Sequence, residues 1–87
     1  ELEVTNLAEL DAALAAGADV ILLDNMTLDE MREATARCRG RALTEASGNV
    51  RPETVAAVAQ TGVDFISLGA LTHSASALDI SLELGLA

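Results

Sequence analysis

The chain of 87 residues contains no lysine, no tryptophan and no tyrosine. Its five positively charged side chains are all arginines, and 14 acidic residues outnumber them to give a formal net charge of −9. An acidic chain is repelled by the phosphate backbone of nucleic acids and by anionic membrane surfaces. We therefore expect neither a nucleic acid nor a membrane as a partner.

Cysteine and aromatic residues are almost absent as well. Cys38 is the only cysteine, which excludes an internal disulfide or a cysteine metal cluster and is typical of a reducing cytosol. The scarcity of aromatic residues predicts an aliphatic core, in which Cys38 should be buried as a small apolar side chain. Apolar runs such as Val20 to Leu23 are too short to cross a bilayer, and the first residues carry no signal pattern. These features favour a cytoplasmic protein.

An internal repeat is the clearest organising feature that is present. The segments 16–24 and 61–69 match at Gly, Asp, Ile and Leu, with a constant offset of 45 residues. Each copy ends a predicted helix with glycine and begins a buried strand. The chain starts inside an apolar alternation without methionine, so we expect it to be an excerpt from a longer chain, and its length excludes a complete second domain.

Strands and helices are predicted to alternate along the whole chain. Strands are expected near 2–4, 19–24, 41–46 and 63–68. Helices are expected from a cap at Asn6 to Gly17, from a cap at Thr27 and Glu30 to Gly40, from Pro52 to Gly62, and from about Ser76 to Leu84. This order predicts an α/β fold with parallel βα repeats and helices outside the sheet. Four units of about 22 residues indicate about half of a TIM-like α/β barrel, which needs roughly eight.

Polar residues and glycines gather at the predicted carboxyl ends of the strands, where parallel α/β folds bind ligands. Gly48 and Gly69 lack a Cβ, so a phosphate could approach the backbone N–H groups there, with the next helix start nearby. Carboxylates at paired strand ends suit sugar hydroxyls or a Mg²⁺ bound to phosphates. The ends in question are Glu3, Asp24-Asn25, Glu45 with Ser47-Gly48-Asn49, and Gly69-Ala70 followed by Thr72-His73-Ser74.

Two of these residues leave alternatives open. Glu45 could serve like the other carboxylates, or could pair with an arginine inside the barrel. His73 is the only histidine. It could contact the phosphate or the substrate, or it could simply be a packed or solvent-facing side chain.

Four motifs together resemble the quinolinate phosphoribosyltransferase family, also called nicotinate-nucleotide pyrophosphorylase (carboxylating). They are Glu-Leu-Glu-Val at 1–4, Leu-Leu-Asp-Asn at 22–25, Glu-Ala-Ser-Gly-Asn at 45–49, and the segment 61–74. The resemblance implies that residues 1–87 are the C-terminal portion of an incomplete TIM-like α/β barrel domain, in an enzyme of de novo NAD biosynthesis. That enzyme would convert quinolinate and phosphoribosyl pyrophosphate to nicotinate mononucleotide, pyrophosphate and CO₂ with Mg²⁺, as a dimer or a higher oligomer such as a hexamer.

The resemblance also implies roles for individual residues. Glu3 and Asp24 would be the catalytic and metal-binding carboxylates that engage the ribose hydroxyls. The 5′-phosphate would lie against two backbone arms, with His73 beside it; the arms are Ser47, Gly48 and Asn49, and Leu68, Gly69 and Ala70.

The chain lacks the family's quinolinate-holding arginines and phosphate-binding lysines, so we expect these 87 residues to be inactive alone. Two other readings stay open. One is another phosphate-binding barrel, such as a thiamine-phosphate synthase or an indole-glycerol-phosphate type enzyme. The other is a structural half-barrel that self-associates through exposed sheet edges.

Overall fold

A five-stranded sheet runs through the computed structural model, which describes residues 1–48, 50–68 and 71–74. The strands lie side by side in chain order, and all neighbours are parallel except the last pair, which is antiparallel. The strands are β1 (Leu2–Val4), β2 (Val20–Asp24), β3 (Leu43–Ser47), β4 (Phe65–Leu68) and β5 (Leu71–Ser74). The predicted parallel βα repeats are thus confirmed.

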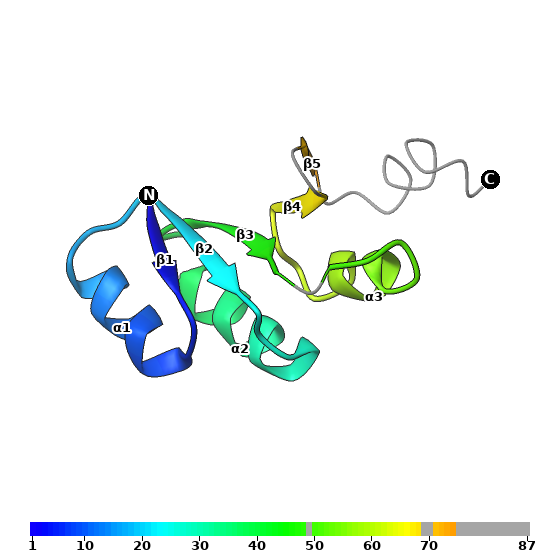
Figure 1. Ribbon diagram of the computed structural model, residues 1–87. Helices are drawn as coiled ribbons and strands as arrows, with labels where there is room; N and C mark the ends of the chain where they lie inside the picture. The colour runs from blue at the N-terminus through cyan, green and yellow to red at the C-terminus, as the bar shows by residue number, and fades with distance from the viewer. Residues whose placement is uncertain (49, 69–70, 75–87) are drawn as a thin grey trace.

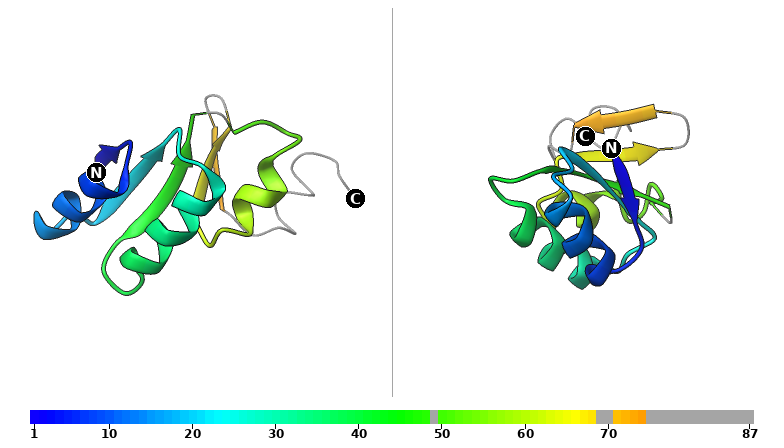
Figure 2. Two further views of the ribbon diagram at one scale, coloured as in Figure 1. Left: turned by 90° about the horizontal axis from the view of Figure 1, so that it is seen from below. Right: turned by 90° about the vertical axis from the view of Figure 1, so that its left-hand side faces the viewer.

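Three helices connect the parallel strands: α1 (Leu7–Ala15), α2 (Leu28–Cys38) and α3 (Val55–Ala59). All three lie on the same face of the sheet, as Figure 1 and the right-hand view of Figure 2 show. This one-sided cover is the arrangement of part of an α/β barrel, in which helices form the outer ring.

The starts of the first two helices are fixed by the predicted caps. The Asn6 side chain accepts a hydrogen bond from the Glu9 N–H at 2.8 Å. At α2, Thr27 and Glu30 form a complete capping box, with bonds of 3.1 and 2.9 Å in the two directions. Each such cap satisfies helix N–H groups that have no partner within the helix.

The start of the third helix is corrected. Pro52 was expected at its first position, but residues 52–54 form a turn and α3 begins only at Val55. The Arg51 N–H donates to Thr54 Oγ1 at 3.1 Å, and the Thr54 N–H donates to the Arg51 carbonyl at 2.9 Å. These local bonds hold a turn in place of the first helical turn.

The end of the described chain also departs from expectation. Thr72-His73-Ser74 was expected as a loop behind the fourth strand, but it belongs to β5, which pairs antiparallel with β4. The β4 backbone groups on this side bond β5, so they are not left exposed at an edge. The helix predicted from Ser76 to Leu84 lies outside the described residues.

The core lies between the sheet and its helices. Ile21, Leu23 and Ile66 have no exposed surface, and helical side chains including Leu10 and Val55 are equally buried against them. Cys38 is 2% exposed within the same cluster, as predicted. Alternate residues of each strand carry apolar side chains, and their burial fixes which face of the sheet points toward the helices.

Candidate functional site

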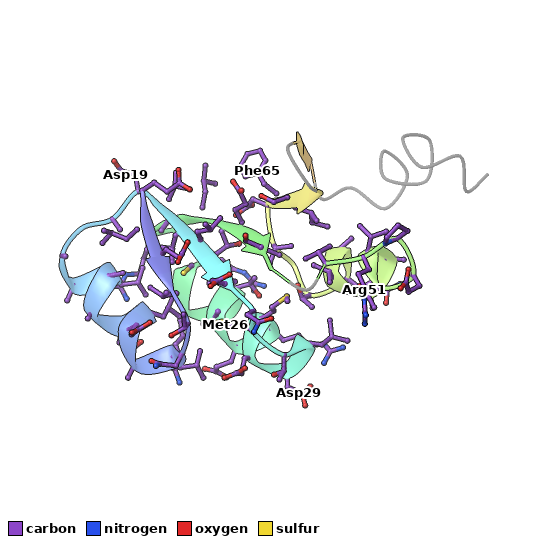
Figure 3. The ribbon with its side chains drawn as sticks, in the orientation of Figure 1. Asp19, Met26, Asp29, Arg51 and Phe65 are labelled. Atoms are coloured by element: carbon purple, nitrogen blue, oxygen red, sulfur yellow. The ribbon has the colours of Figure 1, made fainter. Side chains whose placement is uncertain are left out.

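The polar strand residues project from the face of the sheet that the described helices do not cover. Successive side chains of a strand point to opposite faces. Since Val4, Leu23 and Ala46 are buried on the helix side, their neighbours project from the other face. We call this the bare face; its side chains are Glu3, Val20, Leu22, Asp24, Leu43, Glu45, Ser47, Phe65 and Ser67. Figure 3 shows Phe65 pointing away from the helices on this side.

Strand register brings the two candidate catalytic carboxylates onto neighbouring strands of the bare face. Glu3 lies beside Leu22, and Asp24 follows two residues further along β2. Strand spacing and rise place their Cα atoms about 8 Å apart. Glu3 is exposed and Asp24 is half-buried, so both remain open to a ligand.

The turns after β2 and β3 are packed directly against each other. Asp24 is in register with Ser47, and the Asn25 N–H donates to the Ser47 carbonyl at 2.9 Å. Gly48 has φ +72°, and a Cβ there would lie 2.9 Å from Asp24 Oδ1 and 3.1 Å from the Asn25 nitrogen. Glycine is therefore required at this position both for its conformation and for space.

Asn25 adds to the unusual backbone at this end of the sheet. Its φ of +61° makes it the one non-glycine residue with a positive φ in the described ranges. Asparagine tolerates this left-handed region better than most residues. Asn25 and Gly48, both with a positive φ, thus place two adjacent turns beside Asp24.

Ser67 is a member of this face that the sequence analysis missed. Its hydroxyl donates a hydrogen bond to Glu45 Oε2. No arginine of the described residues forms an ion pair with Glu45, and pairing with an arginine from elsewhere in the barrel stays an open alternative. The alternation Phe65-Ile66-Ser67 contained a usable signal, because a buried Ile66 places Ser67 on the same face as Glu45.

The remaining predicted site residues are placed only in part. Asn49, Gly69 and Ala70 lie outside the described residues. Leu68 is the last residue of β4, and His73 lies opposite Ile66 in β5. His73 therefore occupies a strand position and not the expected loop position. The helix start expected directly behind Gly48 is also wrong, because the turn at 52–54 comes before α3.

No group of three or more His, Cys, Asp or Glu side chains in the described ranges is arranged to hold a metal ion. Mg²⁺ needs less than this, since it is commonly bound by one or two carboxylates together with waters and substrate phosphates. Glu3 and Asp24 fit that donor set. Nor is any described helix long and apolar enough to cross a membrane.

Comparison with known proteins gives one consistent answer. The family described as "Quinolinate phosphoribosyl transferase, C-terminal domain" matches residues 1–83. A Bacillus subtilis protein named "Probable nicotinate-nucleotide pyrophosphorylase [carboxylating]" is 44% identical over 86 residues, covering 99% of this chain and 30% of the relative. A Mycobacterium leprae protein named "Nicotinate-nucleotide pyrophosphorylase [carboxylating]" is 46% identical over 87 residues, covering 97% of this chain and 31% of the relative.

A solved structure agrees with these relatives. The nicotinate-nucleotide pyrophosphorylase from Francisella tularensis superposes with a TM-score of 0.75 at 48% identity, covering 78% of this chain and 25% of that one. The chain therefore spans about 30% of the length of the curated relatives it matches.

Proposed function

Because the chain belongs to the family of the quinolinate phosphoribosyl transferase C-terminal domain, we propose that it is the C-terminal portion of the barrel domain of such an enzyme. The enzyme would convert quinolinate and phosphoribosyl pyrophosphate to nicotinate mononucleotide, pyrophosphate and CO₂ in de novo NAD biosynthesis. The single observation that supports this most is the close packing of Asp24 against Gly48, which sets a carboxylate beside a turn that lacks a Cβ.

The Ser47-Gly48 turn would receive the 5′-phosphate. Gly48 gives this turn a left-handed backbone with φ +72°, and backbone N–H groups in such a turn can bind an anion without formal positive charge. This explains how a chain of net charge −9 could hold a phosphate. Asn49, with Leu68, Gly69 and Ala70 as the second arm and His73 nearby, would complete the cradle.

Glu3 and Asp24 would act on the ribose. As pyrophosphate leaves, positive charge develops on the sugar ring, and carboxylates held nearby stabilise that charge. Mg²⁺, held by the same two carboxylates, would offset the negative charge of the pyrophosphate when bound. The cationic groups that grip quinolinate and pyrophosphate would come from residues outside this chain, which contains no lysine.

Substitution of Asp24 tests the assignment in the full-length enzyme that carries this chain. Asp24→Asn should lower kcat for nicotinate mononucleotide formation by about 10²- to 10³-fold, the usual loss for one transition-state contact. Asp29→Asn is the matched control, because that side chain is 95% exposed on α2. Equal activity of the two variants would contradict the role of Asp24.

Two further assays separate the competing functions. Residues 1–87 alone should form no nicotinate mononucleotide, and turnover near that of a full-length enzyme would refute this. Titration with phosphoribosyl pyrophosphate and other sugar phosphates distinguishes this family from other phosphate-binding barrels, since preference for another sugar phosphate would favour the latter.

Self-association is the second candidate property. Leu2 in β1 and Leu43 in β3 are 44% and 46% exposed, which favours contact with another apolar surface. We infer a homo-oligomer, a dimer or hexamer, in the cytoplasm. A strictly monomeric mass in light scattering would argue against the oligomer.

A further inference from the structure

We propose that Glu45, oriented by Ser67, is a third carboxylate of the phosphoribosyl site and stabilises positive charge on the ribose in the transition state. This inference rests on the proposed function. It assigns a role to a residue for which the sequence leaves two alternatives open.

Register places Glu45 in the same row of the bare face as Glu3. Glu3 lies beside Leu22 on one side, and Glu45 lies beside Leu22 on the other. Two strand spacings separate the two carboxylate-bearing Cα atoms by about 9.5 Å. Both residues therefore border the same strip of the sheet, over the Leu22 side chain.

The depth of Glu45 below the phosphate turn suits a sugar. Glu45 precedes Ser47 by two residues on the same face, which corresponds to about 6.6 Å along the strand. A ribose whose 5′-phosphate lies at Ser47 and Gly48 extends from that turn over the bare face. Glu3 and Asp24 would then border the ring on one side and Glu45 on the other.

Ser67 fixes one oxygen of this carboxylate and leaves the other available. Its hydroxyl donates to Oε2, while Oε1 has no hydrogen-bond donor among the described residues. Both residues are half-buried on the bare face. A carboxylate held in this way is preorganised, because one oxygen is anchored before the ligand arrives.

Among the described residues, no cationic side chain forms an ion pair with Glu45. Three of the five arginines pair with acidic side chains on helices or in the 51–53 turn, in the pairs Arg32–Asp29, Arg37–Asp11 with Glu33, and Arg51–Glu53. Arg39 and Arg41 stand before β3, at the opposite end of the strands from Asp24 and Gly48. A half-buried negative charge is costly without a partner, so its presence on the bare face favours a ligand with positive charge.

The proposed reaction supplies that positive charge. The bond between ribose C1′ and the pyrophosphate oxygen breaks, and its electron pair leaves with pyrophosphate. A bond then forms from the quinolinate nitrogen to C1′. Glu45 takes no proton in this step; it stabilises the charge on the ring while the first bond is broken and the second is incomplete.

Steady-state kinetics of the full-length enzyme carrying this chain test the role. Glu45→Gln removes the charge and keeps an oxygen that can accept from Ser67, so we expect kcat and kcat/KM to fall together by about 10- to 100-fold. Glu33→Gln makes the same chemical change on an exposed α2 side chain and should leave both constants unchanged.

Ser67 is a positioning residue, so its variants should act through Glu45. Ser67→Ala should lower kcat by about 3- to 10-fold, and Ser67→Thr, which keeps a hydroxyl, should restore most of it. The double variant Glu45→Gln/Ser67→Ala should be no slower than Glu45→Gln, because the two side chains act as one unit.

Three outcomes are decisive. Unchanged kcat in Glu45→Gln, in a wild-type enzyme that forms nicotinate mononucleotide, would overturn the role of Glu45 and leave the proposed function intact. A lower melting temperature with unchanged kcat in both single variants would show a purely structural pair and overturn it too. A wild-type enzyme with no such activity would refute the proposed function itself.

Discussion

Gly40 and Gly48 stand before and after the same strand, and both have a positive φ, yet their surroundings differ. A Cβ on Gly40, at the amino end of β3, would meet nothing within 4 Å. A Cβ on Gly48, at the carboxyl end, would collide with the Asp24 carboxylate and the Asn25 backbone. Glycine at the amino end serves only to turn the chain, whereas at the carboxyl end it also permits close packing. The difference agrees with the usual division between stability and ligand binding in parallel α/β folds.

Alanine at these two glycines should separate conformation from crowding. Gly48→Ala combines an unfavourable left-handed φ with overpacking, and we expect it to lower the free energy of unfolding by about 2–4 kcal/mol. Gly40→Ala carries only the conformational cost, about 1–2 kcal/mol. Urea unfolding of both variants measures the difference. An equal loss of unfolding free energy in the two variants would mean that crowding of the new Cβ against Asp24 adds nothing to the conformational cost.

Much of this end of the molecule was predictable because its signals are local. The capping box joins Thr27 and Glu30, which are three residues apart in the sequence. The four apolar residues before Asp24 mark a strand, and Asp24 is its last residue. Strand alternation then decides the face of each side chain. These features identify Glu3, Asp24 and Ser47 as residues of one face without any knowledge of long-range contacts.

The remaining features depend on contacts between distant segments. The Ser67–Glu45 bond and the close approach of Gly48 to Asp24 follow from strand register, which a single sequence does not specify. The helix start predicted at Pro52 is wrong because proline favours the first turn of a helix and a tight turn alike. The internal repeat pairs Asp19 with Asp64 at an offset of 45 residues, but only long-range contacts in the structure distinguish the two side chains.

Asp64 and Asp19 are matched by the repeat, but Asp64 alone braces the amino end of the sheet. Its Oδ2 accepts hydrogen bonds from the Thr44 N–H at 2.8 Å and from Thr44 Oγ1 at 3.3 Å. Thr44 is 1% exposed, and the Asp19 carboxylate has no such partner in the described ranges. Figure 3 shows Asp19 at the start of β2.

Substituting the two aspartates should therefore change stability unequally. Asp64→Ala removes an acceptor from a buried N–H, and we expect a loss of about 1–2 kcal/mol in urea unfolding. Asp19→Ala should change the free energy of unfolding by less than about 0.5 kcal/mol. Neither should alter kcat of the full-length enzyme, because both lie at the amino end. A marked fall in kcat for Asp64→Ala would break the division between the two ends.

The smallest expected effect concerns Cys38, which lines a cavity of about 180 Å³ with Asp64 at the amino end. Burial raises the pKa of its thiol above the ordinary value of 9.0. The native state therefore keeps the thiol neutral over a pH range in which the unfolded chain ionises it. Stability is fully present below pH 9 and declines as pH rises from the unfolded toward the folded pKa.

The composition makes this decline measurable, because the chain has no lysine or tyrosine to titrate in the same range. We expect the free energy of unfolding of the wild type to fall as pH rises above about 9, in the direction set by the raised pKa of the thiol. Cys38→Ala should show a flat profile over the same range, offset by the loss of the buried sulfur. A wild-type profile as flat as that of the variant would mean that the thiol ionises equally in both states, and that burial at the amino end does not protect it.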